Sequence, residues 1–416
     1  MLDAMKTAFK LPDLRKKLLW TLLLLAIFRL GSFVVVPGMN PQEFEADTIF
    51  ALLNLFSGGA LSNMSLFALG VNPYITASII MNLLTMVIPR LEELAKEGVE
   101  GRKVIAQYTR YGTVLLGFLQ ATALTMGFRN AMTDPGNPWA VVTVIAVMTG
   151  GSILLMWLGE VISERGIGNG ISLLIFAGIV SRLLPSTIGT IGALGSGGIN
   201  PLGFLAFLVI ALAVVVLVVV VTEGQRKIPV QYAKRVVGRR MYGGQATHLP
   251  LRINQAGVIP VIFASSVLAF PLTIAQFFPN ISGFFGNLLR WLTPGQWLHL
   301  VLYSLFIFIF TYFYTAVTFN PVEVANNMKK YGGFIPGIRP GRSTAEYLDR
   351  VLSRITLAGA LFLTGIALLP YIIGGITKVP VGFGGTGLLI VVGVAIDTMK
   401  QIEAQLLMRQ YEGFLK

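Results

Sequence analysis

Apolar residues are grouped along the chain into ten long runs, separated by short polar or charged segments. About 20 mainly apolar residues in a helix cross the hydrocarbon core of a bilayer. We therefore predict ten transmembrane helices near residues 18–36, 71–88, 109–127, 140–159, 170–184, 203–222, 254–271, 298–318, 355–371 and 383–399. The run at 203–222 is the clearest because it carries no charge, whereas the run at 170–184 is short and ends at Pro185.

Positive charges are divided unequally between the two sides of this predicted membrane. If the N-terminus is cytoplasmic, 27 of the 32 Lys and Arg residues fall in cytoplasmic segments and four fall in outer ones. Cytoplasmic loops of membrane proteins carry such an excess. The pattern predicts a multi-pass membrane protein with both termini in the cytoplasm.

Composition supports the membrane class and argues against enzymatic chemistry. Hydrophobic residues make up 54% of the chain and charged residues 12%, against roughly 25% charged in soluble domains. The absence of Cys excludes thiolate catalysis and thiolate metal sites, and His248 and His299 lie far apart in the sequence. No phosphate-binding loop is present. We expect no cofactor and no metal, so ATP-driven work must come from a partner.

A nine-residue segment is repeated in the two halves of the chain. Gly70–Ser78 and Gly257–Ser265 share the pattern G-V-x-P-x-I-x-A-S, with six of nine residues identical. Each copy opens the second of five predicted spans, and an odd number of spans gives the halves opposite orientations, as in inverted-repeat transporters. Chance similarity between apolar helices is the alternative. The matching positions favour two halves around a central pathway.

The predicted spans contain almost no charge. Arg29 in the first and Asp397 in the last are exceptions, and we interpret Arg29 as snorkelling or bonding to backbone carbonyls. Ion and solute pathways usually need polar groups inside the membrane. A pathway lined by aliphatic side chains instead gates by excluding water, and it can yield around a chain of varied sequence.

Four further segments lie between the predicted spans or at the edge of one. Residues 57–67 are too short to cross the membrane, and Gly58 and Gly59 ease bending, so this segment is either re-entrant and movable or an ordinary outer loop helix. The Gly166–Gly170 string predicts a tight turn between two spans. Segments 223–253 and 319–354 are long, basic cytoplasmic loops, which favours docking surfaces for partners over a surplus topology signal in contact with anionic lipid.

Several motifs together resemble one family, the SecY family of bacterial protein-conducting channels, over nearly the full length and in order. They are Phe56–Leu61, Gly166–Ser172, Gly224–Pro229 with Tyr232–Arg235, Thr247–Leu251 with Asn254–Pro260, and Phe334–Gly341. The resemblance implies an all-α membrane fold with an hourglass pore between two inverted five-helix halves. The implied divisions are an N-terminal half at 1–185, an outer hinge loop at 186–202, a C-terminal half at 203–400 and a cytoplasmic tail at 401–416.

The resemblance also implies roles for individual residues. The pore ring would consist of Val71, Ile75, Ile171, Ile175, Ile262 and Ile390. Val71 stands at a position where many members of the family carry Ile. The plug would consist of Ser57, Gly58, Gly59, Ala60, Leu61, Ser62, Asn63, Met64, Ser65, Leu66 and Phe67. Candidate lateral-gate residues are Thr76, Asn82, Asn254 and Phe270. Candidate contacts to partners are Lys234, Arg239, Arg240 and Arg339.

The implied function is a channel in the bacterial plasma membrane for unfolded polypeptides. It would release membrane spans sideways into the lipid bilayer and recognise the signal sequences of preproteins. The implied partners are the SecA ATPase or the ribosome, with the small membrane subunits SecE and SecG. Two alternatives remain open at this point: a secondary transporter for a small solute, which the inverted repeat alone permits, and a non-transporting assembly scaffold.

Overall fold

The computed structural model describes residues 9–40, 54, 57–195, 201–232, 235–237, 240–242, 246–275, 283–377 and 385–414. Helices dominate it, and each of the ten predicted spans overlaps one of them. These ten helices are α2 (Pro12–Gly31), α4 (Asn72–Val87), α6 (Val99–Gly127), α7 (Pro138–Arg165), α8 (Gly170–Gly195), α9 (Pro201–Glu223), α10 (Ile259–Ala275), α12 (Trp297–Thr318), α14 (Arg342–Thr377) and α15 (Gly385–Phe414). Shorter helices are α5 (Pro89–Lys96), α11 (Phe284–Leu292), α13 (Pro321–Lys330) and the 3-10 turn Arg129–Ala131.

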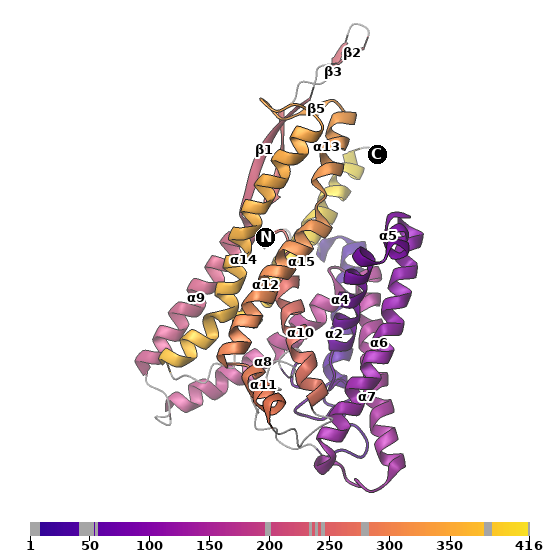
Figure 1. The fold of residues 1–416 in the computed structure, drawn as a ribbon, viewed down its shortest axis with the longest axis vertical. Helices are drawn as coiled ribbons and strands as arrows, with labels where there is room; N and C mark the ends of the chain where they lie inside the picture. Colours follow the sequence, from indigo (N-terminus) through magenta and orange to yellow (C-terminus); the bar gives the residue numbers. More distant parts are fainter. Residues whose placement is uncertain are drawn as a thin grey trace.

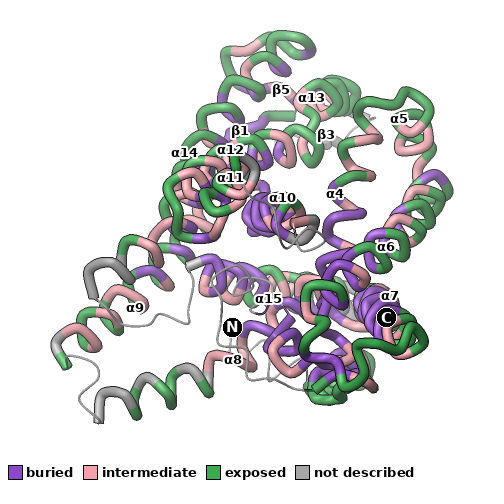
Figure 2. Tube along the Cα trace, turned by 60° about the horizontal axis from the view of Figure 1, so that its bottom comes forward, coloured by how far each residue is buried: buried purple, intermediate pink, exposed green. Residues whose placement is uncertain are grey.

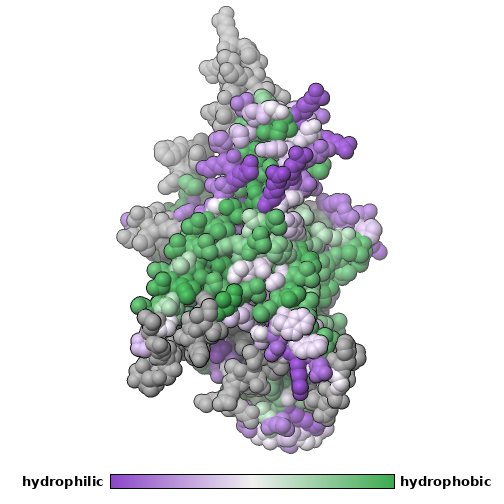
Figure 3. All heavy atoms as spheres, turned by 60° about the vertical axis from the view of Figure 1, so that its left-hand side comes forward, coloured by the Kyte–Doolittle hydropathy of each residue, from purple (hydrophilic) through white to green (hydrophobic). Residues whose placement is uncertain are grey.

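The outer surface of the helix bundle is apolar, as a bilayer requires. Figure 3 shows a broad hydrophobic band across the middle of one face, with hydrophilic residues above and below it. Among the described helices, five are long and apolar enough to cross a membrane, or six if the bent pair α4–α5 forms one span. The side chains of Leu205, Leu212 and Val220 on α9 are exposed. An apolar face this extensive marks a lipid or protein contact surface.

The helices pack mainly within two groups that follow the sequence. In the first group α4 packs on α6, α6 on α7 and α7 on α8, and α2 packs on α7 and α8. In the second, α12 packs between α10 and α14, and α9 packs on α14 and α15. The groups meet chiefly where α10 contacts α4 and α6 and where α15 contacts α8. Buried residues line the parts of α7, α10 and α15 that face the interior (Figure 2).

The sequence repeat is also a repeat of backbone shape. Gly70 has φ +59° and Gly257 has φ +63°, both in the left-handed region that glycine adopts without strain. In each copy the helix begins two residues later, at Asn72 of α4 and at Ile259 of α10. The shared glycine therefore sets the direction in which each of these two helices enters the bundle.

The second helix ends where the sequence predicts, and the reason is local. Pro89 follows Ile88, whose backbone is extended at φ −98° and ψ 111°. A residue before proline is pushed out of the helical region by contact with the proline ring. The chain turns by 101° there, and α5 continues in a new direction.

The two predicted cytoplasmic loops contain strands and form one unit, so a purely α-helical fold needs correction there. β1 (Gln225–Tyr232) pairs antiparallel with β4 (Ala246–Arg252) on one side and with β5 (Gly333–Phe334) on the other. A separate two-stranded antiparallel sheet consists of β2 (Arg235–Val237) and β3 (Arg240–Tyr242). Figure 1 places these strands at one end of the molecule beside α13. A small core holds the unit together through Ile228, Leu251, Ile335, Leu348 and Val351.

Three helices extend beyond the predicted spans. α8 continues through Pro185 to Gly195, so most of the expected outer loop at 186–202 is helical. Proline is tolerated in membrane helices because neighbouring groups satisfy the backbone atoms that it leaves unpaired. α14 begins at Arg342, within the expected loop at 319–354, and α15 runs on to Phe414, through the expected tail.

Candidate functional site

The six predicted ring residues all belong to, or pack against, one large buried cluster of apolar side chains. Val71, Ile75, Ile175, Ile262 and Ile390 belong to one buried cluster, each at most 5% exposed, and the partly buried Ile171 packs against it. They come from the start of α4, from α8, from α10 and from α15, so both halves of the chain contribute.

Helical spacing explains how two of these elements each supply a pair of ring residues. Val71 and Ile75 are four residues apart, as are Ile171 and Ile175, and side chains at this spacing share one face of a helix. All six side chains are aliphatic, so they offer no group that binds an ion. Their chemistry fits a water-excluding constriction.

The predicted plug segment lies inside the molecule. Residues 57–67 form successive turns, and most of them are buried, Ala60 and Met64 completely. The NH of Val36 donates to the carbonyl of Met64 at 2.9 Å, and the NH of Leu66 donates to the carbonyl of Val34 at 2.8 Å. These residues therefore form turns packed inside the bundle and not an exposed helix.

Glycines on the surrounding helices allow this close approach. A Cβ atom on Gly151 of α7 would lie 1.9 Å from the carbonyl oxygen of Leu66. A Cβ atom on Gly31 of α2 would lie 2.2 Å from the ring of Phe67, which stacks on Phe28 with ring centroids 5.9 Å apart. Larger side chains at either glycine would push the segment out of its position.

Arg29 contacts this segment directly. Its Nη1 donates to the carbonyl oxygen of Gly58 at 2.9 Å, and its guanidinium lies over the ring of Phe33, 4.6 Å from the centroid. The expected bond between Arg29 and a backbone carbonyl is confirmed.

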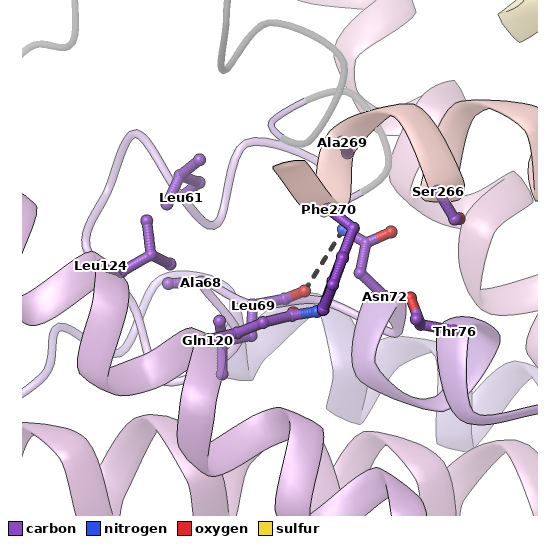
Figure 4. Close-up of a pocket in the computed structure, with 10 residues that line it drawn as sticks. All are labelled: Leu61, Ala68, Leu69, Asn72, Thr76, Gln120, Leu124, Ser266, Ala269 and Phe270. Carbon is purple, nitrogen blue, oxygen red and sulfur yellow. Dashed lines mark hydrogen bonds between the residues drawn. The ribbon is translucent and has the colours of Figure 1, made fainter. Parts of the chain in front are cut away.

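The predicted gate residues lie in three places. Thr76 of α4 and Phe270 of α10 line one small cavity of about 20 Å³ between α4, α6, α10 and the plug segment (Figure 4), with room for about one water molecule. Asn82 is half-buried nearer the C-terminal end of α4. Asn254 precedes α10 and is buried beside a different cavity of about 410 Å³.

Three polar residues of the small cavity were not predicted as gate residues. They are Asn72, whose Nδ2 donates to the carbonyl of Leu69 at 3.5 Å, Gln120 of α6 and Ser266 of α10. The Ser266 hydroxyl is buried without a hydrogen-bond partner among the described residues. A polar side chain within an otherwise apolar span is the sequence signal that points to such positions.

The unit that the two basic loops form presents one predicted partner contact clearly. Arg339 is exposed between Gly337 at φ +81° and Gly341 at φ +101°, and its carbonyl accepts a hydrogen bond from the Thr344 hydroxyl at 2.9 Å. Lys234 and Arg239 lie outside the described residues. Arg240 begins β3, and its side chain is not among those described.

The family model named SecY matches residues 65–399. The chain belongs to the SecY family. "Protein translocase subunit SecY" of Streptomyces galbus is 49% identical over 100% of both chains. The protein of the same name from Thermotoga maritima is 46% identical over 100% of this chain and 98% of that one. These relatives confirm the predicted family and a protein-conducting channel rather than a small-solute transporter.

Solved structures show the SecY-family fold at greater sequence distance. A structure described as "The structure of a protein conducting channel" covers 96% of both chains with a TM-score of 0.69 and 22% identity. Sec61 in a canine ribosome–channel complex from the endoplasmic reticulum covers 96% of both chains with a TM-score of 0.65 and 21% identity. The multi-pass helical architecture is therefore that of the SecY and Sec61 channels.

Proposed function

We propose that this SecY-family chain passes unfolded polypeptides through the central aliphatic cluster and releases apolar segments sideways between α4, α6 and α10. The observation that carries the proposal is one buried apolar cluster to which both halves contribute aliphatic side chains, with the plug segment buried in the same bundle. In this proposal ten spans surround an hourglass pore in the bacterial plasma membrane, with both termini cytoplasmic.

The aliphatic ring supports passage of a chain better than passage of a solute. A narrow apolar constriction excludes water and therefore ions. It forms no specific bonds, so it accepts side chains of any kind as they pass. The plug segment closes the pore from its outer side at rest and leaves when a client enters.

The junction of α10 with α4 and α6 serves as the lateral gate. These contacts join the two halves, and Thr76 and Phe270 lie beside the small cavity between them. Side chains that line a cavity lack partner atoms on one side, so less dispersion attraction opposes the separation of these helices. An apolar signal sequence or membrane span that enters between the helices gains access to lipid.

The cytoplasmic unit docks the partner that supplies energy. It joins both basic loops, and Arg339 projects from it between two turns. We assign SecA or the ribosome to this surface, and SecE and SecG to the apolar outer surface of the bundle. The likeness to a channel from a ribosome–channel complex supports the ribosome as one partner.

Reconstitution tests the proposal. The chain is placed in lipid vesicles with SecE and SecG, and SecA, ATP and a preprotein are added outside. We expect preprotein to become protected from protease inside the vesicles only when all components are present. Protection that does not require the chain, or vesicles that instead accumulate a small solute without SecA, contradicts the proposal.

A further inference from the structure

The guanidinium of Arg29 has an unusual set of partners for a charge within an apolar span. It donates to the carbonyl of Gly58 and lies over the ring of Phe33. None of the five ion pairs found among the described residues includes it. A charge in this environment is costly unless it is hydrogen-bonded. This bond therefore gives the Arg29 guanidinium an acceptor and the Gly58 carbonyl a donor.

The turn at Gly58 and Gly59 contacts α8 on the side away from α2. Gly58 and Gly59 have φ +66° and +90°, so the turn needs glycine. A Cβ atom on Gly58 would lie 2.7 Å from the Cα atom of Gly178, and one on Gly59 would lie 3.7 Å from Nε of Arg182. The turn is thus held between α2 and α8, with an arginine on either side.

The two ends of the plug segment are held differently. Near Met64 and Leu66 the bonds to residues 34 and 36 are neutral and join main chain to main chain. At the Gly58 end the bond to α2 has an ionised donor, and such bonds are about twice as strong as neutral ones. Release of the Gly58 end from α2 therefore depends on one side chain.

We propose that Arg29 is a latch: a positioning residue that holds the plug segment in place through the carbonyl of Gly58. Opening begins when this bond breaks, and the strength of the bond sets how often the resting channel samples the open state. The proposal rests on the proposed function, because it concerns the resting state of that channel.

A single cysteine reports the position of the segment. The chain has no cysteine of its own, and Ala60 is completely buried within the segment, so Ala60→Cys reacts with a membrane-impermeant maleimide only after the segment leaves. In vesicles without a client, we expect Arg29→Gln to raise the labelling rate at least about tenfold, as the loss of a charge-assisted hydrogen bond predicts. Arg29→Lys keeps a charged donor and is expected to restore most of the protection.

Two further variants make the result specific. Lys17→Gln removes another α2 cation whose 3.3 Å bond, to Gln405, lies away from the plug, and we expect no change in labelling. Phe33→Leu alters an exposed residue that contacts the Arg29 guanidinium, and we expect a rise of about threefold from the lost cation–π contact. This variant carries the test if Arg29→Gln fails to fold.

Equal labelling rates in the Arg29→Gln and Lys17→Gln variants overturn the latch. If Arg29→Gln does not fold, an unchanged labelling rate in Phe33→Leu overturns it. Preprotein translocation in the same vesicles separates the two proposals. Normal translocation with unchanged labelling refutes the latch and leaves the channel function standing. Increased labelling of the Arg29→Gln variant, together with no translocation by the chain that retains Arg29, supports Arg29 as the residue that holds the segment and refutes the channel function.

Discussion

Gln231 of β1 lies opposite Phe334 of β5 in the three-stranded sheet, which joins two loops that are far apart in the sequence. The core beneath this sheet includes Leu251 and Leu348, both completely buried. The two loops therefore fold as one unit, and a defect in either should reach the other.

Leu251→Ala should loosen the whole cytoplasmic unit. Removing a buried leucine side chain costs about 2–5 kcal/mol, so hydrogen exchange should accelerate in β1 and β5 together. Val322→Ala changes an exposed residue of α13 and should leave exchange unchanged. Faster exchange confined to β4 would show that the loops do not form one unit.

Replacing Ile75 and Ile262 with glycine should raise the resting ion leak of the channel. The change removes aliphatic groups from the constriction on both halves and lets water enter. Single-channel conductance in a planar bilayer measures the effect. Ile80→Gly is the matched control, because Ile80 is exposed on the same helix as Ile75. A leak as low as in the unchanged protein would remove both residues from the seal.

Arg339→Glu should abolish SecA-driven translocation while the protein stays folded. Arg339 is exposed and held by a turn, so reversing its charge changes the docking surface and little else. Arg350→Glu reverses an exposed charge on α14 outside that turn and should have a much smaller effect. Translocation is measured in vesicles and folding by thermal denaturation; full transport by the Arg339 variant would count against docking there.

Glu160→Gln should lower thermal stability more than Glu92→Gln. Arg110 Nε donates to Glu160 Oε1 at 2.9 Å and joins α6 to α7, with the Glu160 side chain 22% exposed. The pair Lys96–Glu92 lies within α5 and is largely exposed, and such pairs contribute only about 0.3–0.5 kcal/mol. A double-mutant cycle with Arg110→Met should give a coupling energy of about 0.5–3 kcal/mol. Additive effects would show that the pair does not join the helices.

Local signals predicted much of this fold, and non-local contacts explain the rest. A long apolar run is visible in the sequence, so each predicted span overlaps a helix, and Pro89 follows the end of one. The repeat singled out Ile75 and Ile262 before the structure placed them in one cluster. The pairing of β1 with β5 was not visible, because it depends on segments that meet only after folding. The burial of the plug segment depends likewise on Gly31, Gly151 and Gly178 of three other helices.

Cross-linking to a client in transit tests the central claim most directly. A preprotein with one cysteine is arrested part-way through the channel, and Ile75→Cys, Ile262→Cys and the outward-facing control Ile80→Cys are compared one at a time. The chain has no other cysteine, so every disulfide is unambiguous. We predict disulfides to the client from positions 75 and 262 and none from position 80. Disulfides absent from both ring positions, or equally frequent at position 80, would contradict passage of the polypeptide through the aliphatic centre.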